Sequence, residues 1–190
     1  MPGKLLLFCG PSGSGKTTIV QHLLNTDPRL AFSISATTRP KRANEKDGID
    51  YHFLSVDEFR RRIAANEFVE WEEVYAERYY GTLHSEIQRI RNQGKIAVFD
   101  VDVEGGLQIK KVFGDDLLSV FVMPPSVDAL RERLTARKSE TKESLALRIA
   151  KSEHELTYSS RFDKVIINDD LPSALTDAEK LVEEFLGNSK

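Results

Sequence analysis

A glycine-rich loop near the start of the chain carries residue types that suit the binding of phosphate groups. Residues 10–18 read GPSGSGKTT, with glycines at 10, 13 and 15. Glycines let the backbone turn its N–H groups toward an anion, and a helix beginning near Lys16 would add further free N–H groups. Lys16 supplies a positive charge for nucleotide phosphates, and Thr17 a hydroxyl for Mg²⁺. The pattern predicts a nucleoside triphosphate site; the alternative is a glycine-rich turn that binds nothing.

The elements that must position this loop follow in the order the motif requires. The apolar run 5–9 precedes the loop, and apolar residues at helical spacing follow it, including Ile19, Val20 and Leu23. The nearly continuous apolar runs 96–102 and 117–123 indicate strands buried on both faces, and 164–168 is the last predicted strand. Because helical patterns lie between these runs, we expect an α/β fold with an open, mostly parallel sheet and helices on both faces.

A small α+β lobe is predicted between the two halves of this core. Residues 32–36 alternate apolar and hydroxyl side chains, which predicts one short strand, and 68–74 predicts another, with a turn at 79–81. Ser55 and Glu58 have the spacing of a capping box ahead of a helix. Residues 126–158 predict a charged helical hairpin or lid, broken at 137–141. The expected division is a core of 1–33, 85–125 and 155–190, a lobe of 34–84 and a lid of 126–154.

Composition excludes several classes of protein. The 190 residues suit one domain with lobes, and 27 basic against 30 acidic residues argue against a broad basic surface for nucleic acid or a membrane. The single cysteine, Cys9, reads as a packed core thiol, and the four histidines lack metal-ligand spacing, so any metal should arrive with a nucleotide. The first apolar run is too short for a signal peptide or membrane span, and we expect a cytoplasmic protein.

Motifs spread over nearly the whole chain resemble the guanylate kinase family in order and spacing. Besides the loop, they are Ser35-x-Thr-Thr-Arg39-x-x-Arg42, Gly48-x-x-Tyr51, Glu70-Trp71, Tyr80-Gly81, Asp100-Val-Asp102 and Ile167-Asn-Asp-Asp170. The resemblance implies a P-loop NTPase fold and Mg²⁺-dependent transfer of the γ-phosphoryl group of ATP to GMP and dGMP, by a monomer or homodimer. The alternative is a non-catalytic guanylate-kinase-like interaction module, but such modules typically lose phosphate-loop residues, whereas this loop is complete.

The resemblance assigns the GMP phosphate to arginines and tyrosines of the lobe. Arg39 and Arg42 would bind it through guanidinium groups, which fit phosphate bidentately, and Tyr51 and Tyr80 through phenol hydroxyls. Viewed alone, Arg39 or Lys41 would read as part of a solvated basic loop.

The base of GMP is assigned to carboxylates and hydroxyls. Guanine presents two donors, N1–H and the exocyclic amino group, which Glu70 and Asp102 can accept, and Ser35 and Thr82 suit the O6 side. For Glu70 alone, a surface charge at a strand edge is the alternative reading.

The ATP site and the catalytic groups also follow from the resemblance. We expect Asp100 to hold Mg²⁺ through water beside Thr17, on the same strand face as Asp102. The expected ATP-binding residues are Gly10, Pro11, Ser12, Gly13, Ser14, Gly15, Lys16, Thr17, Thr18, Arg133 and Asn168. The expected catalytic residues are Lys16, Arg39, Arg137 and Arg148. The lid arginines could otherwise be surface helix charges, and Asn168 a turn residue at a strand end.

Overall fold

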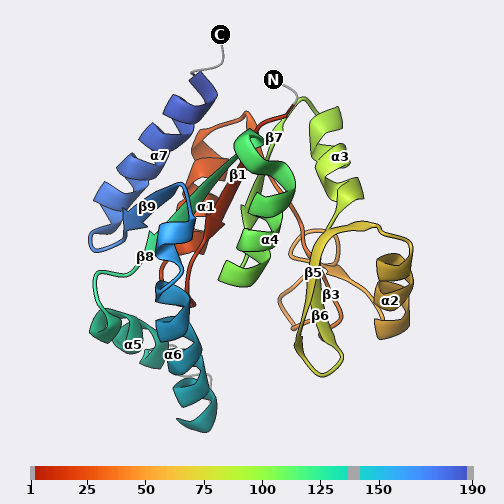
Figure 1. The fold of residues 1–190 in the computed structure, drawn as a ribbon, viewed down its shortest axis with the longest axis horizontal. Helices are drawn as coiled ribbons and strands as arrows, with labels where there is room; N and C mark the ends of the chain where they lie inside the picture. Colours follow the sequence, from red (N-terminus) through yellow and green to blue (C-terminus); the bar gives the residue numbers. More distant parts are fainter. Residues whose placement is uncertain (1–2, 137–141, 188–190) are drawn as a thin grey trace.

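The computed structural model describes residues 3–136 and 142–187, and its centre is a five-stranded parallel sheet (Figure 1). All pairings between its neighbouring strands are parallel. From one edge to the other the strands are β2 (Leu30–Phe32), β7 (Ile96–Asp100), β1 (Leu5–Cys9), β8 (Leu117–Met123) and β9 (Lys164–Ile167). The predicted open parallel sheet is therefore confirmed.

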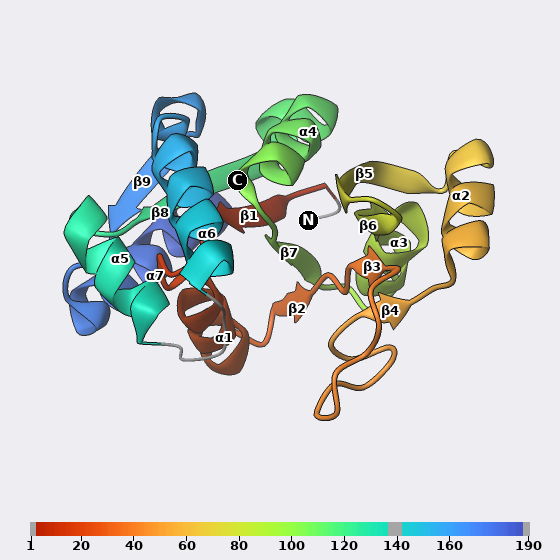
Figure 2. The same cartoon turned by 90° about the horizontal axis from the view of Figure 1, so that it is seen from below.

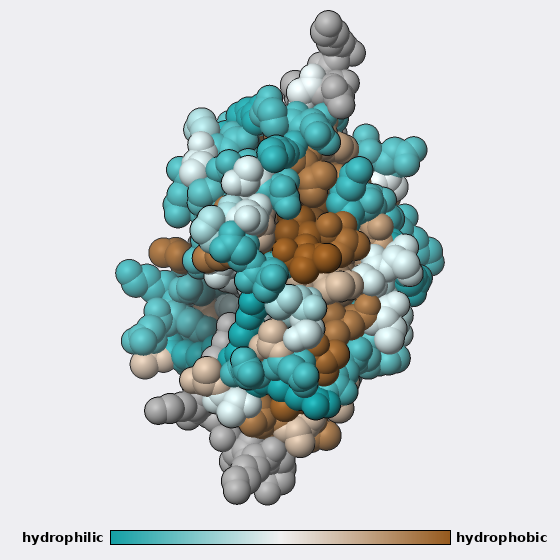
Figure 3. Space-filling view, turned by 90° about the vertical axis from the view of Figure 1, so that its left-hand side faces the viewer, coloured by the Kyte–Doolittle hydropathy of each residue, from teal (hydrophilic) through white to brown (hydrophobic). Residues whose placement is uncertain are grey.

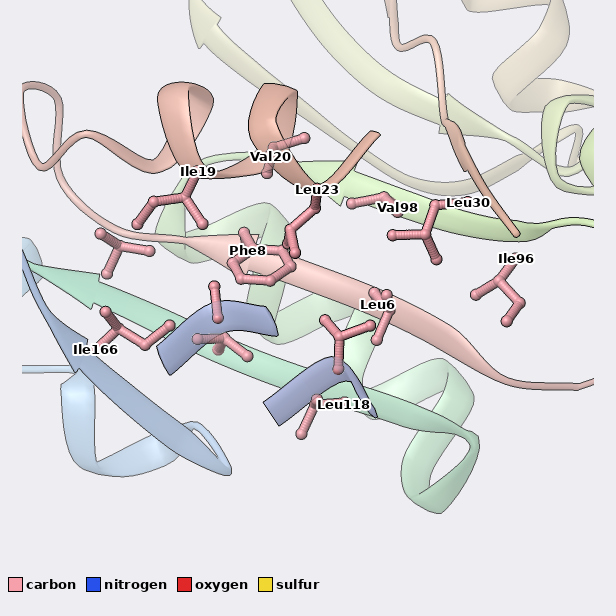
Figure 4. Packing of buried hydrophobic residues seen from close by; sticks show 14 of the residues in the cluster. Leu6, Phe8, Ile19, Val20, Leu23, Leu30, Ile96, Val98, Leu118 and Ile166 are labelled. Atoms are coloured by element: carbon pink, nitrogen blue, oxygen red, sulfur yellow. The ribbon is translucent and has the colours of Figure 1, made fainter. Parts of the chain in front are cut away.

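Helices cover both faces of this sheet, because residues of the buried strands point alternately to the two sides. Leu6 and Phe8 of β1 pack toward α1 (Lys16–Thr26) and α7 (Leu171–Gly187), as Figure 4 shows for the α1 side. Leu5, Leu7 and Cys9 pack on the other face, toward α3 (His84–Asn92) and α4 (Val103–Phe113). Short 3₁₀ helices span Gly114–Asp116 and Ser159–Arg161. The continuous apolar pattern of β1 thus reflects two separate cores.

The predicted lobe contains a second, four-stranded sheet and one helix. Its strand order is β4 (His52–Phe53), β3 (Ala36–Thr37), β6 (Arg78–Leu83) and β5 (Phe68–Tyr75). The helix α2 (Val56–Ala64) packs through Phe59, whose ring stacks on Phe68 at 4.3 Å and on Tyr79 at 5.3 Å between centroids. The Ser55 side chain accepts a hydrogen bond from Glu58 N, as the capping spacing predicts.

Two predictions about this lobe are wrong. The expected single strand at 32–36 is divided between β2 of the first sheet and β3 of the second, because after Ser33 N donates to Val98 O, Ile34 N donates to Glu86 Oε1 instead of to a strand. The expected turn at 79–81 is part of β6, and the turn lies at 76–77, where Glu77 has φ 61°. Gly81 serves close packing, since a Cβ there would lie 2.7 Å from Glu70 O.

Two helices on the opposite side of the molecule from the lobe correspond to the predicted helical hairpin. They are α5 (Val127–Thr135) and α6 (Lys142–Leu156), and the predicted break at 137–141 lies outside the described residues. The nearby face with α7 and the edge strand β9 shows an apolar area (Figure 3), and Val165, Ile167 and Leu171 are exposed in this part of the chain. Within 3–136 and 142–187, no helix combines the length and apolar character that crossing a bilayer requires.

Candidate active site

The glycine-rich loop between β1 and α1 has the backbone conformation that the motif predicts. Gly10, Gly13 and Gly15 have φ of 144°, 88° and 93°, a region that L side chains rarely adopt. The loop is also closely packed: a Cβ at Gly10 would lie 2.4 Å from Val122 O, and one at Gly15 would lie 2.1 Å from Asn168 Nδ2. Because no side chain caps α1 among the described residues, its first N–H groups remain available to an anion.

Thr17 and Asp100 meet beside this loop. Asp100 ends β7 and lies opposite Phe8 of β1, so its carboxylate stands at the edge where the carboxyl ends of parallel strands meet. Thr17 Oγ1 donates a 2.6 Å hydrogen bond to Asp100 Oδ2. Both side chains offer oxygen ligands of the kind Mg²⁺ prefers. In the described parts of the chain, no group of three or more histidine, cysteine or carboxylate side chains could hold a metal by itself.

A cleft of about 1040 Å³ connects the loop with the second sheet and the helix α6. Seen from below, α6 lies on one side of the end of the central sheet and β3, β5 and β6 on the other (Figure 2). Many predicted site residues line this cleft, namely Gly10, Ser12, Lys16, Thr17, Ser35, Tyr51, Glu70, Tyr80, Asp100, Asp102 and Arg148. The fold therefore brings together residues that are more than one hundred positions apart in the sequence.

Glu70 is a buried carboxyl group with one hydrogen-bonded neighbour on the adjacent strand. The β5–β6 register places Thr82 opposite it, and Thr82 Oγ1 donates to Glu70 Oε1 at 2.7 Å. A β-bulge between Phe68 and Glu70 lets Phe68 pack under α2 while Glu70 faces the cleft. Glu70 is only 6% exposed. This burial, together with the nearby charge of Asp102, raises the pKa of Glu70 to about 7. A buried carboxylate of this kind is suited to accept donors from a ligand.

Asp102 lies in the cleft, but not on the strand face where it was expected. The strand β7 ends at Asp100, and Asp102 is the N-cap of α4, where its Oδ1 accepts a 3.0 Å hydrogen bond from Gly105 N. The prediction of a shared strand face is therefore wrong, because a helix cap sets the direction of the side chain. The other oxygen, Oδ2, lies 3.4 Å from Lys151 Nζ of α6.

Arg39 is held by an acidic neighbour that the sequence reading missed. Its guanidinium group makes two hydrogen bonds to Glu45, at 2.6 and 2.7 Å, and stands 4.9 Å from the centre of the Tyr51 ring. The pair lowers the pKa of Glu45 to about 2 and raises that of Arg39. The Arg42 side chain is 75% exposed, with Nη1 3.9 Å from Glu45 Oε1. Arg39 lies beside Tyr51, which lines the cleft, and both arginines lie beside Glu45. Neither arginine lines the cleft itself.

The remaining predicted residues belong to the loop, contact it, or lie outside the described residues. Asn168, 5% exposed, donates from Nδ2 to Ser14 O at 2.8 Å, and Arg133 Nη2 donates to Asn168 O at 2.9 Å. These contacts tie the phosphate loop to the end of β9. Pro11, Gly13, Ser14, Gly15 and Thr18 belong to the loop or the first turn of α1 without lining the cleft, and Arg137 lies outside the described residues.

Several cleft residues were not identified from the sequence. Lys151 and Glu155 of α6 line the cleft together with Arg148, and Glu72 lies two residues beyond Glu70 on β5. Burial and neighbouring carboxylates raise the pKa of both Glu72 and Glu155 to about 7. The positions 148, 151, 152 and 155 recur at helical spacing, so one face of the predicted lid helix was the available signal.

Comparison with known proteins agrees with this geometry. A family model described as guanylate kinase matches residues 2–185. The guanylate kinase of Bacteroides fragilis strain YCH46 is 55% identical over 97% of this chain and 90% of its own length, and that of Porphyromonas gingivalis is 47% identical over 96% and 98%. A crystal structure of guanylate kinase from Anaplasma phagocytophilum covers 99% of this chain and 87% of its own, with a TM-score of 0.75 and 24% identity, which supports the shared fold alone.

Proposed function

Because this chain belongs to the guanylate kinase family, we propose a role in that reaction for each part of the cleft. Its activity is that of the family, the transfer of a phosphoryl group from ATP to GMP. The phosphate loop is complete in residues 10–18, and nothing in the described residues favours a non-catalytic interaction module.

One observation carries the assignment of the two substrates. The cleft has the glycine-rich loop at one end and two carboxyl groups at the other, the buried Glu70 and the partly exposed Asp102, whose side chain is 33% exposed. The loop with Lys16 would bind the phosphates of ATP. The carboxylates would accept hydrogen bonds from N1–H and the amino group of guanine, with Ser35 on the O6 side. Thr82 was expected there as well, but its hydroxyl donates to Glu70 Oε1 and it does not line the cleft, so it would orient that carboxylate instead. Adenine lacks this arrangement of donors, so both carboxylates would lose their partners on the base. A site of this kind can discriminate against the wrong base by up to roughly 10⁴-fold.

The lobe would hold the phosphate of GMP. Arg39 is oriented by Glu45 and by the Tyr51 ring, which limits the entropy lost when it binds an anion. Arg42 would add a second guanidinium group, and the hydroxyls of Tyr51 and Tyr80 would donate without adding charge. The attacking oxygen belongs to a phosphate whose second pKa is about 6, so it is ionised at neutral pH and requires no general base.

Catalysis would then consist of positioning and charge neutralisation. Lys16 would stabilise the charge that develops on the transferred group, and Arg148, on the cleft side of α6, would reach it from the lid. We expect the same of Arg137. Movement of lobe and lid toward each other would exclude water and strengthen these interactions. The division into core, lobe and lid at residues 33/34, 84/85, 125/126 and 154/155 is proposed on this basis.

The Thr17–Asp100 pair fits a magnesium ion carried by ATP. Thr17 Oγ1 and Asp100 Oδ2 lie 2.6 Å apart beside the loop, so the protein would offer the ion only two side chains with oxygen ligands. This suits Mg²⁺, which keeps several water molecules and also binds nucleotide oxygens. When bound, Mg²⁺ neutralises charge on the phosphates. Thr17 would bind the ion directly, and Asp100 would orient a water molecule bound to it.

Further expectations about the enzyme are proposals of the same kind. Phosphorylation of dGMP is expected because the contacts proposed here involve only the base and the phosphate. A cytoplasmic location is expected from its nucleotide substrates. A monomer or a homodimer is expected, and neither nucleic acid nor a membrane is an expected partner.

The variant Asp102→Asn tests the assignment of the base. Asparagine caps helices as well as aspartate does, so the substitution keeps α4 and removes the charge. We expect kcat/KM for GMP to fall about 10- to 100-fold and that for AMP to stay within about twofold. Asp115→Asn, an exposed carboxylate outside the cleft, is the control. An unchanged GMP:AMP ratio in a folded Asp102→Asn protein would refute the assignment.

A further inference from the structure

Lys151 of the helix α6 contacts the carboxylate that the proposed function assigns to guanine. Its Nζ lies 3.4 Å from Asp102 Oδ2 and 3.7 Å from Glu155 Oε1, and its side chain lines the cleft. Glu155 is 7% exposed and belongs to the same helix, one turn further on. The three side chains therefore form a chain of alternating charge, Glu155, Lys151 and Asp102, which runs from the lid helix to the start of α4.

The contacts of Asp102 leave its carboxylate little freedom to rotate. Oδ1 accepts from Gly105 N at 3.0 Å, and Oδ2 faces the ammonium group of Lys151. Because each carboxylate oxygen has two lone pairs, Oδ2 can accept a hydrogen bond from a base while Lys151 stays in place. Lys151 and a guanine amino group are thus compatible neighbours of this oxygen.

The base end of the cleft is crowded with acidic groups. Glu70, Glu72, Asp102 and Glu155 all line it, and mutual repulsion among carboxylates would push them apart. Burial lowers the pKa of Lys151, but the neighbouring Asp102, Glu155 and Glu72 outweigh it and raise the pKa overall, so the side chain is a cation in contact with Asp102 and Glu155. A cation at this position offsets the repulsion among them.

We propose that Lys151 is a positioning residue for guanine recognition: it fixes the Asp102 carboxylate from the lid side, and so contributes to selectivity for bases with an amino group at C2. The inference rests on the proposed assignment of Asp102 to the base. Since Lys151 belongs to α6, the contact also connects the lid helix with the base site. Lys151 acts through Asp102 and has no contact with the reacting phosphates in this account.

The test compares GMP with IMP, whose base lacks the C2 amino group. Dissociation constants are measured by calorimetry for the wild type, Lys151→Met, Lys151→Arg and the control Lys111→Met, an exposed lysine of α4 outside the cleft. We expect Lys151→Met to weaken GMP binding about fivefold and IMP binding less than twofold, with kcat at saturating GMP within about twofold of wild type. Lys151→Arg should restore most of the GMP affinity. Thermal unfolding identifies any variant that fails to fold.

A double-mutant cycle with Asp102→Asn separates this inference from the assignment on which it rests. If Lys151 acts through Asp102, adding Lys151→Met to Asp102→Asn should change GMP affinity by less than about 1.5-fold. Two results would overturn the inference: unchanged GMP affinity in folded Lys151→Met, or equal weakening of GMP and IMP binding in that variant. In either case, a GMP-selective effect of Asp102→Asn would leave the assignment of Asp102 to the base intact. If Asp102→Asn weakens GMP and IMP equally, Asp102 does not accept from the C2 amino group, and the inference fails together with that part of the assignment.

Discussion

Burial of Glu70 predicts that the base site destabilises the ligand-free protein at neutral and higher pH. In the folded chain the pKa of this carboxyl is about 7, against an ordinary value of 4.5, chiefly because it is desolvated. Between these values the folded protein keeps a proton that the unfolded chain has released, so the free energy of unfolding falls as pH rises. At about 1.4 kcal/mol per pH unit, the difference corresponds to about 3 kcal/mol.

The variant Glu70→Gln removes this ionisation while it keeps the size of the side chain and a partner for Thr82. We expect the variant to be more stable than the wild type at pH 8, and its advantage to be about 2 to 3 kcal/mol larger at pH 8 than at pH 5. The measurement is urea unfolding of both proteins without nucleotide at several pH values. Glu72 and Glu155 titrate in both proteins, so their contributions cancel in the difference.

Glu184→Gln, an exposed glutamate of α7, is the matched control and should differ from the wild type by the same small amount at both pH values. The functional side of the same prediction is a loss of GMP affinity in Glu70→Gln, because the carboxylate acceptor is gone. A stability difference between Glu70→Gln and wild type that does not depend on pH would refute the reasoning from burial.

Three further predictions concern the phosphate loop and the metal. Lys16→Ala should lower kcat by at least about 10²-fold with an unchanged circular dichroism spectrum, because its charge acts on the transferred group; an active, folded variant would contradict its role. Excess EDTA should lower turnover by a similar factor, restored by Mg²⁺, while the melting temperature of the nucleotide-free chain stays constant; activity that persists without divalent ions would contradict the role of Thr17 and Asp100. Asn168→Ala should cost about 1 to 3 kcal/mol in urea unfolding and raise the KM for ATP, because it frees Ser14 O and loosens the loop; unchanged stability would show that this contact does not hold the loop.

The phosphate loop and the central sheet could be predicted from the sequence because their signals are local. An apolar run, three glycines, a lysine and a threonine follow each other within fourteen residues, 5–18, and each has a physical role at its position. The runs that became β7 and β8 are almost entirely apolar, apart from Asp100 and Ser119, because helices cover both faces.

The parts that sequence reasoning missed depend on contacts between distant segments. The division between β2 and β3 depends on Glu86, which accepts a hydrogen bond from Ile34 N across 52 positions. The β-bulge before Glu70 reverses the alternation that would have placed it on the same face as Phe68. Lys151 reaches Asp102 only because the end of the central sheet brings α6 beside α4. The first two contacts leave no periodic pattern in the sequence. The helical spacing of 148, 151, 152 and 155 marks one face of α6, but it does not indicate that Asp102 is the partner of Lys151.

The central claim is that the cleft pairs a phosphate loop for ATP with a carboxylate site that selects guanine. It is tested most directly by measuring ATP-dependent phosphorylation of GMP, AMP, CMP and UMP in parallel, with and without Mg²⁺. The account predicts rapid turnover of GMP alone, dependent on Mg²⁺, with kcat/KM for AMP lower by roughly 10²-fold or more. Comparable turnover of AMP and GMP by the folded protein, or none with any monophosphate, would contradict it.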